Sequence, residues 1–157
     1  MKRTLLTVCA VLIFTAVNGV FAEQSDVNLF NELSAAYSSG FYPGAVSYAD
    51  RLASEYPRSL FIGRALTVKG ECLVRLGQTE DALSALEQAQ LYVKDDKKLL
   101  LACSYWKARA LYARADYAEA VSLFHSYCAI GGENGEFFSS CVLYAGRSLY
   151  VQNSYKE

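Results

Sequence analysis

Apolar residues recur at helical spacing in the middle of the chain and are interrupted once, by a glycine. Between residues 60 and 93 the apolar positions at helical spacing include Leu66, Leu73, Leu76, Ala82, Leu83, Leu86 and Ala89, and Gly77 separates the third of these from the fourth. Glycine adopts the left-handed conformation of a helix end at little cost. Thr79 is placed to cap the following helix, whose first turn carries Glu80 and Asp81. The pattern predicts two helices joined by a tight turn.

The same pattern repeats with a period of 37–38 residues. A shift of 38 aligns Gly70 with Ala108 and Gly146, Leu73 with Leu111 and Leu149, Ala82 with Ala120, and Leu86 with Phe124. A shift of 37 toward the N-terminus brings Gly77 onto Gly40 and Ala82 onto Ala45. In the third unit, Asp116 and Glu119 form a capping-box pattern. We predict an all-α solenoid of antiparallel helix pairs, with about three and a half repeats near residues 26–57, 60–93, 98–131 and 136–157, the last incomplete.

These aligned positions resemble the pattern of the tetratricopeptide repeat (TPR) family. The matching residues are Gly70, Leu73, Gly77, Ala82, Leu86 and Ala89 in the second unit and Ala108, Leu111, Ala120 and Phe124 in the third. The stretch from Tyr42-Pro43-Gly44-Ala45 to Tyr56-Pro57-Arg58-Ser59 is also similar to periplasmic repeat proteins of the outer-membrane assembly lipoprotein type. Those lipoproteins carry a cysteine at the cleavage point of their signal peptide. Cys9 comes too early for that role, so we do not expect a lipid anchor.

The resemblance implies a concave face that is built mainly by the first helix of each pair and that binds a peptide or a helix of a partner protein. Its positions here are rich in arginine and tyrosine, which are residue types that anchor interfaces, and guanidinium groups match carboxylates. We therefore expect a groove whose arginines pair an acidic side chain or a C-terminal carboxylate. The alternative is that the tyrosines pack between repeats while the arginines point to solvent. The candidate partner-binding residues are Tyr37, Arg64, Arg75, Tyr105, Arg109, Tyr112, Arg147 and Tyr150.

The first 22 residues have the layout of a secretory signal peptide. Lys2 and Arg3 precede an uncharged run from Leu5 to Val17, and Val20 and Ala22 place small residues three and one before Glu23. We expect cleavage after Ala22 and export, with the periplasm as the destination. An uncleaved anchor is the alternative, although the apolar run is short for a membrane span.

Removal of residues 1–22 changes the charge and the cysteine count. The chain carries 15 basic and 16 acidic residues, and losing Lys2 and Arg3 leaves 13 against 16, a net charge of about −3. This balance argues against a nucleic-acid-binding domain. Four cysteines remain, namely Cys72, Cys103, Cys128 and Cys141. Cys128 and Cys141 flank the glycine-rich turn 131–135 and are a candidate disulfide, while four reduced, buried thiols are the alternative.

No pattern of catalytic, cofactor or metal-binding residues is present in the sequence. His125 lies three residues before Cys128 on a similar helix face, but this context favours a surface residue over a catalytic base. The cysteines lack the paired spacing of zinc sites, and the turn 131–135 lacks the lysine of a phosphate-binding loop. We expect neither an enzyme nor a cofactor, and no nucleic-acid partner.

The last repeat is cut short in the sequence. Tyr155-Lys156-Glu157 aligns with Tyr117-Ala118-Glu119, where a second helix would begin, and the preceding helix is apolar on several sides. We expect a fragment of a longer array, or a single helix that serves as a cap, and self-association through this open repeat. The predicted function is a protein-interaction scaffold of the bacterial envelope. The alternatives are a spacer module of a longer envelope protein, or an accessory domain of an enzyme whose catalytic part lies beyond residue 157.

Overall fold

The described part of the chain, residues 25–154 of a computed structural model, consists of seven helices and contains no strand. A first helix over residues 25–38 is followed by α2 (Tyr42–Glu55), α3 (Ile62–Arg75), α4 (Thr79–Tyr92), α5 (Lys97–Ala113), α6 (Tyr117–Gly131) and α7 (Phe138–Ser154). The predicted signal peptide and the aligned end Tyr155-Lys156-Glu157 lie outside the described residues. None of the helices within residues 25–154 is long and apolar enough to cross a membrane.

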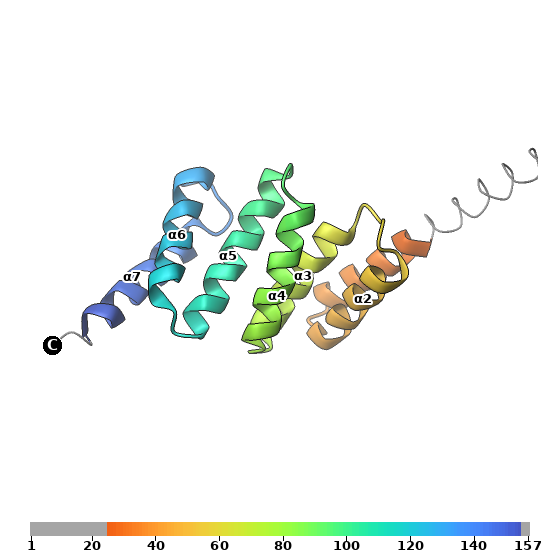
Figure 1. The fold of residues 1–157 in the computed structure, drawn as a ribbon, viewed down its shortest axis with the longest axis horizontal. Coiled ribbons are helices and arrows are strands. Elements are labelled where there is room, and N and C mark those ends of the chain that lie inside the picture. Colours follow the sequence, from red (N-terminus) through yellow and green to blue (C-terminus); the bar gives the residue numbers. More distant parts are fainter. Residues whose placement is uncertain (1–24, 155–157) are drawn as a thin grey trace, which may run out of the picture.

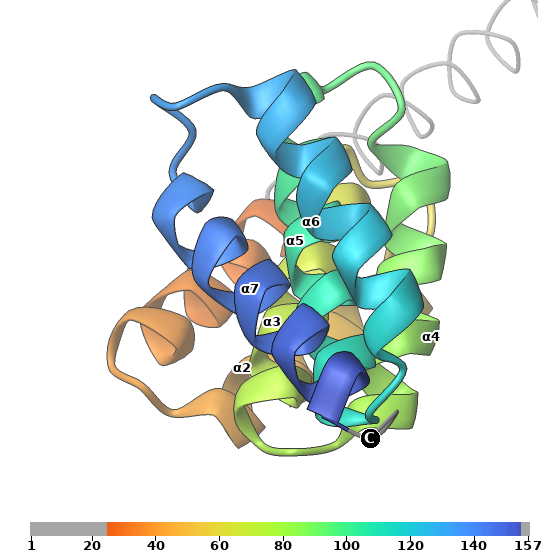
Figure 2. The ribbon, with the colours of Figure 1, turned by 90° about the vertical axis from the view of Figure 1, so that its left-hand side faces the viewer.

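The helices form a row of antiparallel hairpins stacked along the long axis of the molecule (Figure 1). The first helix, α3, α5 and α7 are the leading helices of the successive repeats, and α2, α4 and α6 are the following helices. Leading helices contact one another, α3 against α5 and α5 against α7, and each following helix packs on its neighbours. The predicted all-α, TPR-like solenoid is confirmed. Viewed from its C-terminal end, the stack presents α7 in front of the other helices (Figure 2).

Each hairpin turn uses one residue with a left-handed backbone. Gly40 and Gly77 have φ of 77° and 76°, and Ala115 has φ of 69° at the equivalent place in the third repeat. The residue after each of these donates its backbone N–H to a carbonyl of the preceding helix. For example, the Gln78 N–H donates to the Leu73 carbonyl at 2.9 Å, and the Asp116 N–H donates to the Leu111 carbonyl at 2.9 Å. The left-handed helix end that we predicted at Gly77 is confirmed.

Side-chain caps differ from the sequence prediction. Helix α4 begins at Thr79 itself, behind Gln78, and no side chain caps it, so the Thr79 cap was wrong. Asp116 does occupy the N-cap position of α6, but its carboxylate bonds to the Arg114 guanidinium and leaves the helix end without a side-chain cap. Asp96 is the residue that caps a helix, since its Oδ1 accepts from the Leu99 N–H at 3.0 Å.

The small residues of the repeat set the spacing of the helices. A Cβ atom added to Gly70 would overlap Leu86 Cγ of α4, so the glycine is what allows α3 and α4 to approach this closely. Ala108 and Phe124 are both fully buried in the next repeat, at positions 38 residues further on. The core is therefore a continuous series of these contacts along the stack.

Candidate protein-binding face

Arginine and aromatic side chains alternate along one face of the stack, on the leading helices α3, α5 and α7 and at the start of α2. We call this set the guanidinium–aromatic ladder; its members are Tyr42, Arg75, Trp106, Arg109, Tyr144 and Arg147. The Arg75 Cζ lies 5.5 Å from the ring centroid of Tyr42 and 5.1 Å from that of Trp106. The Arg109 Cζ lies 5.8 Å from Trp106 and 4.1 Å from Tyr144. The Arg147 Cζ lies 5.7 Å from the ring centroid of Tyr144. Cation–π attraction therefore holds each guanidinium over at least one ring.

The repeat explains why these side chains meet. Trp106 and Tyr144 are 38 residues apart, and an arginine follows each of them three positions later, on the same face of its helix. Because α5 and α7 pack in the same register, Arg109 reaches across to the ring of the next repeat. The sequence carried this signal as an aromatic–x–x–arginine motif that recurs at the repeat distance.

At the α3 end, one carboxylate neutralises the face. Glu71 is 9% exposed and its Oε1 accepts from the Tyr37 hydroxyl at 2.7 Å. The same oxygen accepts from Arg75 Nε and Nη2 at 3.0 and 2.9 Å. Burial and the neighbouring Glu71 carboxylate raise the pKa of Tyr37, so its hydroxyl stays protonated as the donor. Tyr37, Glu71 and Arg75 satisfy one another.

At the α5–α7 end, the arginines have no carboxylate partner among residues 25–154. Arg109 Nη1 donates to the Tyr105 hydroxyl at 2.9 Å, and none of the described residues supplies an acidic group to Arg109 or Arg147. Cation–π contacts leave the formal charge in place. This end of the ladder therefore presents two fixed, uncompensated guanidinium groups that are suited to an anionic group of a ligand.

Of the predicted residues, the structure brings Arg75, Arg109 and Arg147 together in the ladder. Arg64 lies apart from it, with its Cζ 6.0 Å from the Phe30 ring. Tyr150 is 74% exposed on α7. The sequence prediction did not include Tyr42, Glu71, Trp106 or Tyr144.

The predicted tyrosines act mainly as support. Tyr105 is 3% exposed and stacks on Phe137 at 4.1 Å, so a partner would not touch its ring. Tyr112 lies edge-on to Tyr117 and Tyr144, with centroids 5.5 and 5.0 Å away. These contacts agree with the alternative given above for the tyrosines, which is that they pack between repeats. The arginines, by contrast, lie over aromatic rings.

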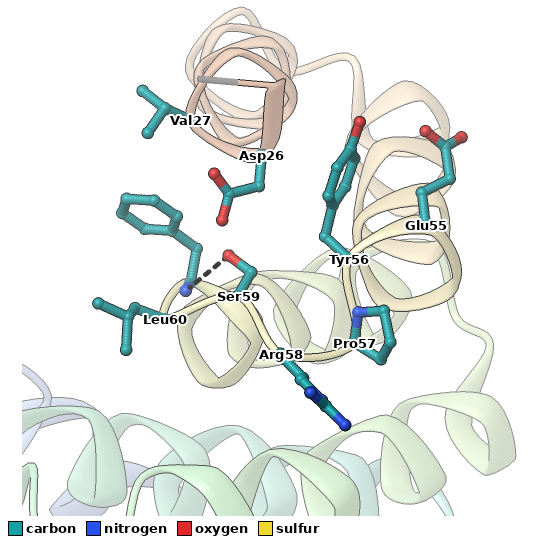
Figure 3. A pocket seen from close by; sticks show the side chains of 9 residues that line it. Asp26, Val27, Glu55, Tyr56, Pro57, Arg58, Ser59 and Leu60 are labelled. Carbon is teal, nitrogen blue, oxygen red and sulfur yellow. Dashed lines mark hydrogen bonds between the residues drawn. The ribbon is translucent and has the colours of Figure 1, made fainter. Parts of the chain in front are cut away.

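A separate hollow lies between the first helix and the loop that joins α2 to α3 (Figure 3). It has a volume of about 480 Å³, and Asp26, Tyr56, Ser59 and Phe61 are among the residues that line it. Asp26 is 8% exposed and its Oδ1 forms no hydrogen bond with the described residues. The Phe61 N–H donates to Ser59 Oγ at 3.2 Å on the floor of the hollow. None of the predicted site residues lines this hollow.

The four described cysteines are free thiols in the structure. Burial, together with the Cys128 thiol hydrogen-bonded beside it, raises the pKa of Cys141 to about 12. Burial also raises the pKa of Cys72 to about 12, and that of Cys103, whose Sγ lies 3.1 Å from Thr67 Oγ1. Cys128 and Cys141 are thus neighbours, and their disulfide stays a prediction.

The described residues contain no group of three or more histidine, cysteine and acidic side chains that could hold a metal ion. His125 is exposed on α6.

Comparisons with known proteins bear on the fold. No protein-family model and no curated protein sequence matches the chain. Among solved structures, the chain is similar to the TPR2B domain of yeast Sti1 in its complex with pHsp70, with a TM-score of 0.66 and 16% sequence identity. The similarity covers 80% of this chain and 96% of that domain. At this identity the match shows a TPR-like fold and no more.

Proposed function

We propose that this chain is a non-enzymatic protein-interaction module of the bacterial envelope that binds a peptide or helix of a partner protein across the guanidinium–aromatic ladder. Arg109 and Arg147 pair an acidic side chain or a C-terminal carboxylate of that partner. The similar TPR2B domain was solved with a protein partner, pHsp70, which supports a protein or peptide as the ligand class.

The observation that carries the proposal is the pair of guanidinium groups that lack an acidic partner in residues 25–154. Arginine loses rotamer freedom when it binds a ligand, and that cost lowers affinity. Contacts with Tyr144, at 4.1 Å for Arg109 and 5.7 Å for Arg147, already restrict both side chains. The site is therefore partly preorganised for a carboxylate.

The envelope location rests on the sequence. Residues 1–22 have the charge and apolar pattern of a signal peptide, and export would place the ladder in the periplasm. Fractionation of cells that express the full chain, together with the N-terminal sequence of the purified protein, tests this location. A chain that keeps Met1 and stays in the cytoplasm would contradict it.

Peptide binding tests the ladder directly. A library of peptides with free C-termini is selected against the purified chain, and the affinity of an enriched peptide is measured by fluorescence anisotropy. The double substitution Arg109→Glu with Arg147→Glu should weaken binding by more than about tenfold, because both charge-assisted contacts become repulsive. Amidation of the peptide C-terminus, or loss of its acidic residues, should weaken binding to the parent chain.

The matched control is Lys94→Glu with Lys98→Glu, which makes the same change of net charge at two exposed residues, one in the α4–α5 turn and one in the first turn of α5. These two residues lie outside the ladder, so binding should be nearly unchanged. If the two double variants bind equally well, the ladder is not the site. A chain that selects no peptide at all favours the spacer role.

A further inference from the structure

The outer side of α7 is apolar and exposed. Val142, Leu143 and Leu149 are 52%, 50% and 42% exposed, whereas Cys141 and Ser148 on the inner side are fully buried. Figure 2 shows α7 at the end of the stack, in front of the other helices. Apolar exposure of this extent on one helix face is typical of an interaction surface.

In the other repeats, the side of the helix that corresponds to the outer side of α7 is buried. Leu143, Gly146 and Leu149 occupy the positions that Tyr105, Ala108 and Leu111 occupy in α5, and all three of the latter are buried. The equivalent residues of α3, Thr67, Gly70 and Leu73, are buried as well. In α3 and α5 the next helix of the stack covers this side. On α7, no helix of the described residues does so.

Gly146 marks the centre of the uncovered side. A Cβ on Gly70 would meet the Leu86 side chain of the covering helix, but a Cβ on Gly146 would meet no atom within 4 Å. A shallow hollow of about 460 Å³ surrounds this glycine, and Tyr112, Val142, Leu143, Arg147, Tyr150 and Val151 line it with Gly146. The hollow is large enough to receive a bulky apolar side chain.

The apolar residues are arranged symmetrically about Gly146. Leu143 and Leu149 lie three positions before and after it, and Val142 and Tyr150 lie four positions before and after. An antiparallel copy of the same helix, related by a two-fold axis at Gly146, would set Leu143 against Leu149 and Val142 against Tyr150. The face thus carries both a hollow and apolar side chains on either side of it, which is the arrangement a self-complementary two-fold interface uses.

Charge does not oppose this pairing along most of the face. Arg147 is the single charged residue of α7, and its guanidinium lies over the Tyr144 ring, on the side of the ladder. No carboxylate of α7 would be buried without a partner. Two glycines at the crossing would also let the helix backbones approach closely.

We propose that a second copy of this chain covers the outer side of α7, and that the two α7 helices pack antiparallel with Gly146 at their crossing. Leu143, Gly146 and Leu149 lie outside the ladder, whereas Arg147, which lines the hollow together with Gly146, belongs to it. Dimerisation is measured without any peptide, so its outcome can be told apart from that of the peptide-binding test.

Sedimentation equilibrium of the purified full chain, as the cell processes it, tests the proposal over a wide range of concentration. The parent chain should form a reversible dimer. Gly146→Leu should weaken dimerisation by at least about tenfold, because it fills the hollow at the crossing. The fold should tolerate this change, since the site is open in the single chain, and circular dichroism checks this.

Gly146→Leu also distinguishes a specific interface from non-specific hydrophobic association, because the substitution adds apolar surface. Tighter association of this variant would show non-specific contact and overturn the proposal, and so would a parent chain that stays monomeric at every concentration. Leu91→Glu is the matched control, since Leu91 is 66% exposed on α4, away from α7. It should leave the dimer unchanged, and loss of the dimer in this variant would place the interface elsewhere.

Discussion

Ala115 holds the backbone conformation that glycine holds in the two preceding turns. Its φ of 69° compares with 77° at Gly40 and 76° at Gly77. The left-handed conformation costs an L-residue with a Cβ roughly 1–2 kcal/mol. Ala115→Gly should therefore raise the free energy of unfolding by about 0.5–1 kcal/mol, after the greater chain entropy of glycine in the unfolded state is counted. Urea denaturation of the two chains measures the difference.

Gly77→Ala is the reverse substitution at the equivalent turn. It should lower the free energy of unfolding by about 1 kcal/mol, since space is open around the added methyl group and the backbone conformation is the main cost. Equal stability of all three chains would show that the left-handed turn is not strained at Ala115.

Single residues show where sequence reasoning succeeded and where it stopped. Gly77 could be placed at a helix end because glycine is the residue that favours this backbone. Glu71 could not be recognised, because a carboxylate on a helix face looks solvated until its neighbours are known. Its burial, and its bonds to Tyr37 34 residues away and to Arg75, come from the packing of the first helix on α3.

Of the five helices α2 to α6, α5 is the one that begins with a side-chain cap. Asp96→Ala removes the bond from the Leu99 N–H to Asp96 Oδ1 and should lower the free energy of unfolding by about 1 kcal/mol. Asp116→Ala is the matched control at the start of α6, where no side-chain cap forms, and its effect should be within about 0.5 kcal/mol. Thermal or urea unfolding of both variants compares them. A larger loss for Asp116→Ala would contradict the assignment of caps.

Element boundaries were harder to predict than element identity. The capping box at Asp116 and Glu119 has the right residue types at the right spacing, and Asp116 does precede α6. The structure nevertheless directs its carboxylate to Arg114. Competition of this kind between a nearby guanidinium and a backbone N–H is decided by local geometry, which a spacing rule does not contain.

The last two helices are adjacent through Cys128 and Cys141, and export would expose this pair to an oxidising compartment. We expect the intact mass of the chain purified from that compartment to be two hydrogens below the reduced value, and reduction to restore them. A disulfide that closes a loop of this length stabilises the fold by about 3 kcal/mol, so reduction should lower the urea midpoint. Cys141→Ser should abolish both effects.

Cys72→Ser is the control, because Cys72 packs in a separate cluster with Ala36 and Ala45. It should keep the mass difference of the oxidised chain. A reduced mass for the parent chain would instead favour four buried thiols. Those thiols would react slowly with alkylating reagents at neutral pH, since the pKa of Cys141 and of Cys72 is raised to about 12.

At the scale of the whole molecule, the 37–38-residue period was sufficient to predict the stack. Helical periodicity gave the helices, and the aligned small residues gave the close contacts, as Gly70 and Leu86 show. The period alone was not sufficient to predict the ladder, because Arg109 contacts Tyr144 of the next repeat, 35 residues away in sequence. Such a contact follows from the register of α5 on α7, which appears only when the repeats are stacked.

The single carboxylate of Glu71 also gives the binding face a direction. Near α3 the positive charge of Arg75 is neutralised, whereas near α5 and α7 no acidic group of the described residues neutralises Arg109 or Arg147. Under the proposed function, a bound segment would lie with its acidic end over α5 and α7. A peptide of reversed sequence would bring its carboxylates toward Glu71 and meet repulsion there. The face would thus distinguish a sequence from its reverse, although both have the same composition.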